Sequence, residues 1–156
     1  MRSKALLLSI ALLSLIITSA CNSVETQAKG AAPKTVDANA PGGQADDGVK
    51  RINIADAKAD FEKGKAVMID VRGDMAFKQG HIKGAQSIAF SEITERAADL
   101  PKDKTIILYC SCPAEHSSVA AGQALHKKGV DNTAALVGGY PAWKSAGYPV
   151  EEPAAN

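Results

Sequence analysis

The stretch TIILYCSCPAEHSSVAAG, residues 105–122, places a strand, a cysteine-containing loop and the start of a helix in direct succession. The apolar run Thr105–Tyr109 is the strongest strand signal in the chain. A helix capped by Ser117 or Ser118 is predicted to follow and to end before Gly129. This order of strand, loop and helix is typical of one unit of an α/β fold.

Segments on both sides of this unit repeat the alternation. The predicted strands are 51–54, 66–69, 85–89, 105–109 and 134–137, and the predicted helices are 55–63, 75–79, 91 to the residue before Pro101, 117 or 118 to 128, and 140–145. Such alternation predicts the fold class α/β, with a central, mostly parallel sheet flanked by helices on both faces. Ligands of such sheets bind beyond the carboxyl ends of the strands. Cys110 follows the strongest strand at that edge, so its position makes it the first functional candidate.

The first residues have the layout of a secretory signal. Arg2 and Lys4 are basic, Ala5–Ile17 is apolar, and small residues precede Cys21. The apolar run is shorter than the roughly 20 residues that a membrane span needs. We therefore predict a signal peptide over residues 1–20.

The cysteine at this boundary resembles the lipobox of bacterial lipoproteins, although Thr18 stands where that motif usually has leucine. The resemblance implies acylation of Cys21 and a membrane anchor outside the cytoplasm, on the periplasmic face. Asn22 is not the aspartate associated with inner-membrane retention, which favours the outer membrane. An ordinary cleaved signal and an uncleaved anchor are the alternatives.

Residues 21–50 are predicted to be a disordered tether, because they have no aromatic residue and too few apolar ones to offset the entropy of ordering. Residues 51–153 are long enough for one small domain with one core. The whole chain has 18 Lys and Arg against 17 Asp and Glu. A nucleic-acid partner would favour a concentrated basic face, and none is expected.

Three ordered motifs in the domain resemble those of rhodanese-like domains. They are VMIDVRGDMAFKQGHIKGAQSI (67–88), LYC (108–110) and LVGGYPAWKSAGYPV (136–150). The resemblance implies a sulfurtransferase, in which Cys110 takes a sulfane sulfur from a small anionic donor such as thiosulfate or a polysulfide and holds it as a persulfide. It then passes the sulfur to a thiol or cyanide-like acceptor. No cofactor and no metal are implied, and a monomer is expected.

The loop after Cys110 is predicted to bind the substrate. A thiolate is the reactive form of cysteine, and inward-pointing amides followed by a helix N-terminus are expected to lower the Cys110 pKa and to hold an anion. The loop residues are Ser111, Cys112, Pro113, Ala114, Glu115, His116 and Ser117.

This loop departs from the common family pattern, which has four residues and then an arginine after the cysteine. Here it is about two residues longer and contains no arginine, and it resembles a subgroup with Cys-x-Cys-Pro-x-Glu. The missing bidentate anion partner weakens the case for thiosulfate as the physiological donor. Hydrolysis of phosphate esters, as in related phosphatases, is disfavoured because that chemistry needs the loop arginine.

Cys112 has several interpretations. It resolves the persulfide, forms a disulfide with Cys110, binds a soft metal with it, or is a spectator thiol. Two cysteines alone are a poor metal signal. Glu115 and His116 either assist the chemistry or are simply solvated.

Other positions of these motifs are predicted to be architectural. Asp70 and Arg72 should form a structural ion pair, and His81 should lie in a turn. Gly138 and Gly139 should permit close backbone approach or positive φ beside the loop, and Trp143 should pack in the core. No catalytic role is predicted for them.

Two functions compete with the sulfurtransferase. One is a non-catalytic rhodanese-like binding module, favoured by the missing arginine and disfavoured by the presence of Cys110. The other is a thiol redox protein that uses Cys110 and Cys112 as a dithiol.

Overall fold

The computed structural model describes residues 47–112 and 114–153. The predicted signal peptide, the acylation of Cys21, and the tether up to residue 46 lie outside the described residues and stay predictions. Within the described part of the chain, no helix has the length and apolar character needed to cross a membrane.

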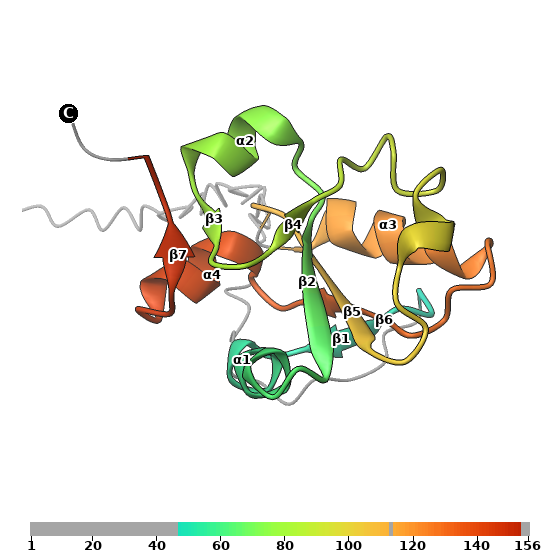
Figure 1. The fold of residues 1–156 in the computed structure, drawn as a ribbon, viewed down its shortest axis with the longest axis horizontal. Coiled ribbons are helices and arrows are strands. Elements are labelled where there is room, and N and C mark those ends of the chain that lie inside the picture. Colours follow the sequence, from blue (N-terminus) through green and yellow to red (C-terminus); the bar gives the residue numbers. More distant parts are fainter. Residues whose placement is uncertain (1–46, 113, 154–156) are drawn as a thin grey trace, which may run out of the picture. The chain divides into compact units, whose positions relative to one another are not determined.

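Strands and helices alternate along the domain (Figure 1). The strands are β1 (Lys50–Ile52), β2 (Ala66–Asp70), β3 (His81–Ile82), β4 (Gln86–Ser87), β5 (Thr105–Tyr109), β6 (Thr133–Leu136) and β7 (Val150–Glu151). The helices are α1 (Ile54–Glu62), α2 (Asp74–Gln79), α3 (His116–His126) and α4 (Gly139–Ser145), and a short 3₁₀ helix, η1, covers Ala97–Asp99.

The central sheet confirms the predicted α/β class. It has five strands in the order β1-β6-β5-β2-β4, and its neighbours pair in parallel. The strands β2 and β5 are in full register, which pairs Asp70 with Tyr109 at their carboxyl ends. The residues that follow these two strands therefore lie side by side at the edge where ligands of such sheets bind.

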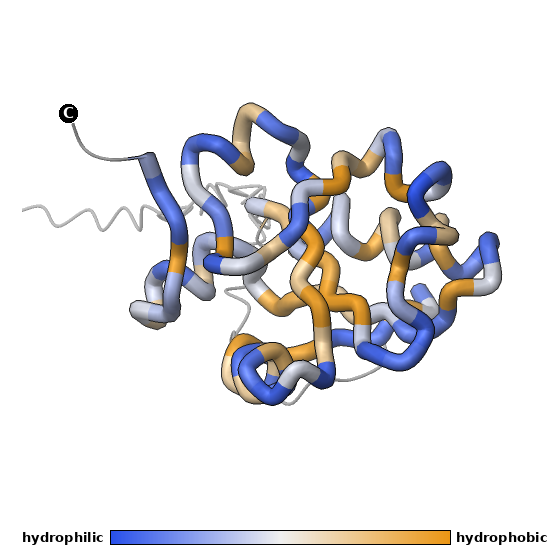
Figure 2. The backbone as a smooth tube through the Cα atoms, viewed as in Figure 1, coloured by the Kyte–Doolittle hydropathy of each residue, from blue (hydrophilic) through white to orange (hydrophobic). Residues whose placement is uncertain are grey.

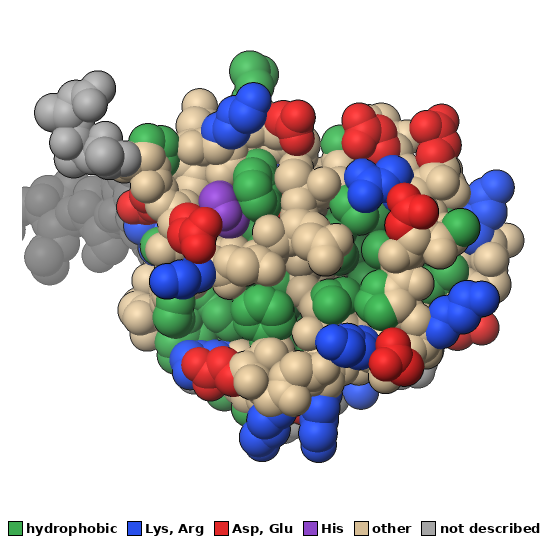
Figure 3. Space-filling model, in the orientation of Figure 1, with side chains coloured by type: hydrophobic (Ala, Val, Ile, Leu, Met, Phe, Trp, Pro, Cys, Tyr) green, Lys and Arg blue, Asp and Glu red, His purple; other side chains and the backbone are tan. Residues whose placement is uncertain are grey.

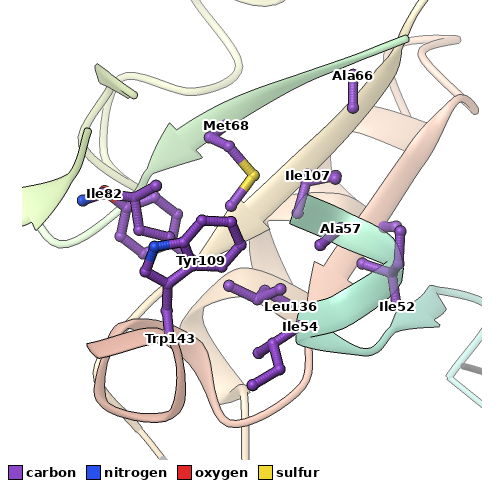
Figure 4. Packing of buried hydrophobic residues seen from close by; sticks show 11 residues of the cluster. Ile52, Ile54, Ala57, Ala66, Met68, Ile82, Ile107, Tyr109, Leu136 and Trp143 are labelled. Carbon is purple, nitrogen blue, oxygen red and sulfur yellow. The ribbon is translucent and has the colours of Figure 1, made fainter. Parts of the chain in front are cut away.

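Alternate side chains of β5 point to opposite faces of the sheet, as the period of a strand requires. Ile107 and Tyr109 belong to a cluster with α1 and α4, in which Tyr109, Trp143 and Met68 lie together (Figure 4). Trp143 is 2% exposed and donates to the Pro149 carbonyl at 3.0 Å, which confirms its core role.

The opposite face packs against α3. Ile106, Leu108 and Cys110 of this face share a cluster with Ala121 and Leu125, two fully buried residues four positions apart on α3. Hydrophobic residues accordingly concentrate in the strands and thin out toward the loops (Figure 2). On the surface that Figure 3 shows, Lys and Arg side chains are interspersed with Asp and Glu.

Three sequence-based boundaries were wrong. No α-helix starts at Ser91: residues 91–96 form turns closed by bonds such as Glu95 N to Glu92 O, and η1 follows. The segment is held to the core at Ile93 and Leu100, and short turns satisfy its backbone between these anchors.

The last strand of the chain is β7 rather than residues 134–137. It pairs antiparallel with β3 in a separate two-stranded sheet.

His81 lies in this small sheet rather than in a turn. Its ring stacks on Phe77 with centroids 3.6 Å apart and contacts Glu151 Oε2 at 3.2 Å, so its architectural role is confirmed.

The tether was extended too far toward the domain. Val49 is fully buried, and the Gln123 side chain donates to the Asp47 carbonyl at 3.1 Å. Val49 lies so close to α3 that a Cβ atom at Gly122 would be 2.9 Å from it. Residues 47–50 therefore belong to the packed domain, because the Val49 side chain packs against α3 at Gly122, which has no side chain to block it.

Candidate functional site

The backbone of Cys110 is clamped at the end of β5. Its carbonyl accepts a hydrogen bond from Tyr140 N at 2.9 Å. Gly138 and Gly139 have φ of 70° and 56°, and a Cβ at Gly139 would lie 2.2 Å from the Cys110 carbonyl oxygen. Only glycine fits that approach, so the prediction for these two glycines is confirmed.

The sulfur atoms of Cys110 and Cys112 lie 3.1 Å apart, and both cysteines are free thiols. Cys112 N donates to Cys110 Sγ at 3.4 Å. The hydroxyls of Ser118 and Ser117 approach Cys110 and Cys112 at 3.9 and 3.8 Å. Cys110 is buried and Cys112 is half-buried, so Cys112 carries the more accessible sulfur.

The expected lowering of the Cys110 pKa is not what the structure gives. Burial raises the pKa of the Cys110 thiol, and the hydrogen bond with Cys112 raises it further. The amides of Cys112 and Ser118 do lower it, as predicted for the loop, but they do not offset burial. The hydrogen bond from Cys110 lowers the pKa of Cys112 instead. Within the reduced pair, Cys110 is therefore the donor that keeps its proton, and Cys112 is the thiol that ionises more readily.

Glu115 is buried, in contrast to the solvated position considered from the sequence. Its Oε1 accepts from Gly138 N at 2.7 Å, and its Oε2 lies 3.8 Å from Arg51 Nε. The carboxylate therefore ties the loop to the turn before α4. Both carboxylate oxygens are thus in contact with groups of the protein.

The same residue explains why neither Ser117 nor Ser118 caps α3. Glu115 occupies the cap position with left-handed backbone (φ 52°, ψ 19°), and the helix begins at His116. Ser118 lies inside the first turn, where its hydroxyl donates to the Glu115 carbonyl at 2.9 Å. A non-glycine residue in this conformation is uncommon, and the bonds of the buried carboxylate hold it there.

Asp70 and Arg72 form the predicted structural pair, with Arg72 Nη2 2.6 Å from Asp70 Oδ2. Arg72 also donates to the Gly80 carbonyl at 2.6 Å and to Ser111 Oγ at 3.2 Å. Burial lowers the pKa of Arg72, but the hydrogen bond and charge of Asp70 raise it more. A guanidinium thus reaches the loop from β2, which brings a positive charge to a loop without its own arginine.

The other predicted loop residues are peripheral. Ser111, Ala114 and His116 are exposed, and Ser117 is half-buried. Pro113 lies outside the described residues. Within residues 47–112 and 114–153, no group of three His, Cys, Asp or Glu side chains is placed to hold a metal ion.

The sequence missed two features of the site. Arg72 was assigned to structure alone, although the register of β2 with β5 puts residues after Asp70 beside residues after Tyr109. Glu115 was expected either to assist the chemistry or to be solvated, and its partner Gly138 is 23 positions away in the chain. The parallel pairing of the two strands could have suggested the first contact, but no local pattern signals the second.

Comparison with known proteins agrees with this architecture. The family model of the rhodanese-like domain matches residues 53–146. The chain belongs to the rhodanese-like domain family. The match extends from the residue before α1 to the residue after α4, so it includes the cysteine loop and both glycines that clamp it.

Relatives of this rhodanese-like domain include named enzymes. The thiosulfate sulfurtransferase GlpE of Pseudomonas fluorescens is 36% identical over 109 residues, which cover 69% of this chain and 94% of the relative. The uncharacterized protein YqhL of Bacillus subtilis is 35% identical over 96 residues, covering 60% of this chain and 75% of the relative. Among solved structures, the rhodanese-like domain of the Alr3790 protein from Anabaena sp. has a TM-score of 0.59 at 27% identity, over 68% of this chain and 86% of that chain.

Proposed function

We propose that the domain is a sulfurtransferase that carries sulfane sulfur as a persulfide on Cys110. The observation that carries the proposal is the placement of this thiol. Cys110 follows the central strand β5 at the carboxyl edge of the sheet, within 3.1 Å of a second sulfur that can take its proton. Family membership and the thiosulfate sulfurtransferase relatives support the same activity.

The hydrogen-bonded pair suggests how a buried thiol attacks a donor. Cys112 accepts the proton of Cys110 while Cys110 attacks the sulfane sulfur. With thiosulfate, the S–S bond of the donor breaks and sulfite leaves with the bonding electron pair. The products are a Cys110 persulfide anion, a protonated Cys112 and sulfite. The Arg72 guanidinium at Ser111 supplies positive charge toward an anionic donor.

A thiol redox function is a second candidate, because the 3.1 Å between the two sulfurs favours it directly. In that case the two thiols are oxidised to a disulfide by a partner disulfide, without any added sulfur. The two functions differ in one product. Sulfur transfer passes through a chain that has gained one sulfur atom, and thiol exchange does not.

Loading of sulfur onto single-cysteine variants tests the proposal. The chain has three cysteines, so Cys21→Ser serves as the background in all samples. We expect intact-mass spectrometry after treatment with thiosulfate or polysulfide to show one added sulfur on Cys112→Ser and none on Cys110→Ser. Sulfur on Cys110→Ser alone would assign the nucleophile to Cys112 and overturn the proposal. The proposal would also be overturned if neither variant gains sulfur and the chain with both Cys110 and Cys112 shows no added sulfur, hydrosulfide or disulfide with either donor.

A further inference from the structure

The most unusual feature of the site is the second sulfur. Cys112 Sγ lies 3.1 Å from Cys110 Sγ, with Ser111 alone between the two residues in the chain. Proton transfer during loading explains a hydrogen-bond partner for Cys110, but after loading Cys112 remains as a protonated thiol in contact with the persulfide. Two reactions are then open to it, and the geometry separates them.

In the first reaction, Cys112 takes the terminal sulfur and becomes the new persulfide. Displacement at sulfur proceeds in line, so Cys112 Sγ would have to lie beyond the terminal sulfur. An S–S bond is about 2.05 Å, so this arrangement needs the two Sγ atoms at least about 4.1 Å apart. The separation in the reduced pair is 3.1 Å, so the relay requires the two sulfur atoms to move apart by about 1 Å.

In the second reaction, Cys112 attacks the inner sulfur, which is Cys110 Sγ itself. This atom is the one with which Cys112 Sγ is already in contact. The leaving group would be hydrosulfide, a weaker base than an alkyl thiolate, and leaving groups of lower basicity depart faster. Burial raises the pKa of Cys110, which makes the Cys110 thiolate expelled in the relay a poorer leaving group still.

We propose, resting on the persulfide function above, that Cys112 resolves the Cys110 persulfide by attack on Cys110 Sγ, releases hydrosulfide and leaves a Cys110–Cys112 disulfide. One S–S bond breaks and another forms. The proton of the Cys112 thiol goes to the terminal sulfur, which leaves as HS⁻ with the bonding pair. The terminal sulfur is reduced by two electrons, and the two cysteines are oxidised to the disulfide.

The partner implied by this step is a dithiol reductant, because the disulfide must be reduced before the next donor can react. Such a reductant would attack Cys112 Sγ, since Cys112 is half-buried whereas Cys110 is 2% exposed. Cys110 Sγ would then leave with the bonding pair and take up the proton of the attacking thiol, so that Cys110 is again a free thiol that can be loaded. A disulfide that closes over a single intervening residue gains little from constraining the unfolded chain, which suits a bond that is broken in every cycle. The domain thus acts as a dithiol-dependent producer of hydrosulfide from sulfane sulfur.

A single-turnover experiment without oxygen tests this step. The full chain with Cys21→Ser, and the same chain with Cys112→Ser added, are treated with polysulfide, desalted, and followed by intact mass and by hydrosulfide detection with no reductant present. We expect the chain with both cysteines to release one equivalent of hydrosulfide and to end two hydrogens lighter than its reduced form. The Cys112→Ser chain should keep its added sulfur and release hydrosulfide only after dithiothreitol is added.

The outcomes separate this step from the persulfide function. Equal retention of added sulfur by both chains would overturn the resolving role of Cys112 and leave the persulfide function intact. Added sulfur that peptide mapping places on Cys112 would overturn it in favour of the relay. If the Cys112→Ser chain acquires no sulfur and the chain with both cysteines releases no hydrosulfide, the persulfide function itself is overturned, and the resolving role with it.

Discussion

The ends of β2 and β5 are neighbours in the sheet, yet the residues after them are held by hydrogen bonds of different strength. After β2, Arg72 donates to both carboxylate oxygens of Asp70, to the Gly80 carbonyl and to Ser111 Oγ at 2.6 to 3.2 Å. After β5, the sulfur atoms of Cys110 and Cys112 have polar contacts at 3.1 to 3.9 Å. Thiols are weak donors and acceptors, whereas charge-assisted bonds are the strong ones.

This difference divides two tasks between adjacent strand ends. Asp70 and Arg72 are bonded mainly to each other, so they fix the edge of the sheet. The sulfurs after β5 are weakly held, so they can exchange partners at small cost. Ser111 Oγ joins the two ends, because it accepts from Arg72 Nη1 and lies between the two cysteines in the chain. A rigid end thus supports a reactive one.

Replacing Asp70 with asparagine should break the rigid end most severely. Asp70 is fully buried and the Arg72 side chain is 11% exposed, so Asp70→Asn leaves a guanidinium charge with little solvent. Loss of one partner of a buried pair costs about 3–5 kcal/mol of unfolding free energy. Urea denaturation followed by circular dichroism measures the loss.

The matched control is Asp99→Asn, which makes the same aspartate-to-asparagine change in the exposed Arg96–Asp99 ion pair. Exposed pairs contribute about 0–1 kcal/mol. If the two variants lose similar free energies of unfolding, the Asp70–Arg72 pair does not stabilise this edge of the sheet.

Glu115→Gln should have a smaller effect, and it tests what holds the reactive end. The amide oxygen of glutamine can still accept from Gly138 N, but the charge-assisted bond and the interaction with Arg51 are lost. We expect a loss of about 1–3 kcal/mol, the range for weakening a buried hydrogen bond to a charged group. Thermal or urea unfolding measures it against Glu92→Gln, an exposed glutamate in the turn before η1.

An equal effect of both substitutions would mean that the loop conformation does not depend on the Glu115 carboxylate. Retention of stability in Glu115→Gln with loss of sulfur loading would instead give this carboxylate a chemical role, in conflict with its bonds to Gly138 and Arg51.

The sequence was sufficient for the features that depend on local periodicity. The apolar run Thr105–Tyr109 and the run ending in Asp70 became β5 and β2, because continuous burial on both faces leaves a direct signature in the residues. The position of Cys110 at the carboxyl edge followed from the strand alone. The Asp70–Arg72 pair followed from the motif.

The remaining features depend on contacts between distant segments. Glu115 is buried because Gly138, 23 positions later, offers an amide, and its left-handed backbone moves the start of α3 to His116. The pKa order of the two cysteines depends on how deeply each is buried and on the distance between them. Residues 91–100 have helical spacing but take up turns around two buried anchors, Ile93 and Leu100. No local pattern contains this information.

The smallest effect we predict is a change in the pKa values of Cys110 and Cys112 when either partner is removed. The hydrogen bond from Cys110 lowers the pKa of Cys112, and the thiolate is the form that alkylates. Alkylation of Cys112 should therefore persist to lower pH than that of an ordinary thiol, whose pKa is about 8.5.

Cys110→Ala removes the hydrogen-bond donor, so the pH midpoint for alkylation of Cys112 should move up toward that value. In Cys112→Ala the midpoint for Cys110 should move down, since the partner sulfur raises the Cys110 pKa. Rates of iodoacetamide reaction against pH, in the Cys21→Ser background, measure both midpoints. An upward shift for Cys112 and a downward shift for Cys110 would show that the two thiols are coupled by a hydrogen bond. Two unshifted midpoints would show that they titrate independently.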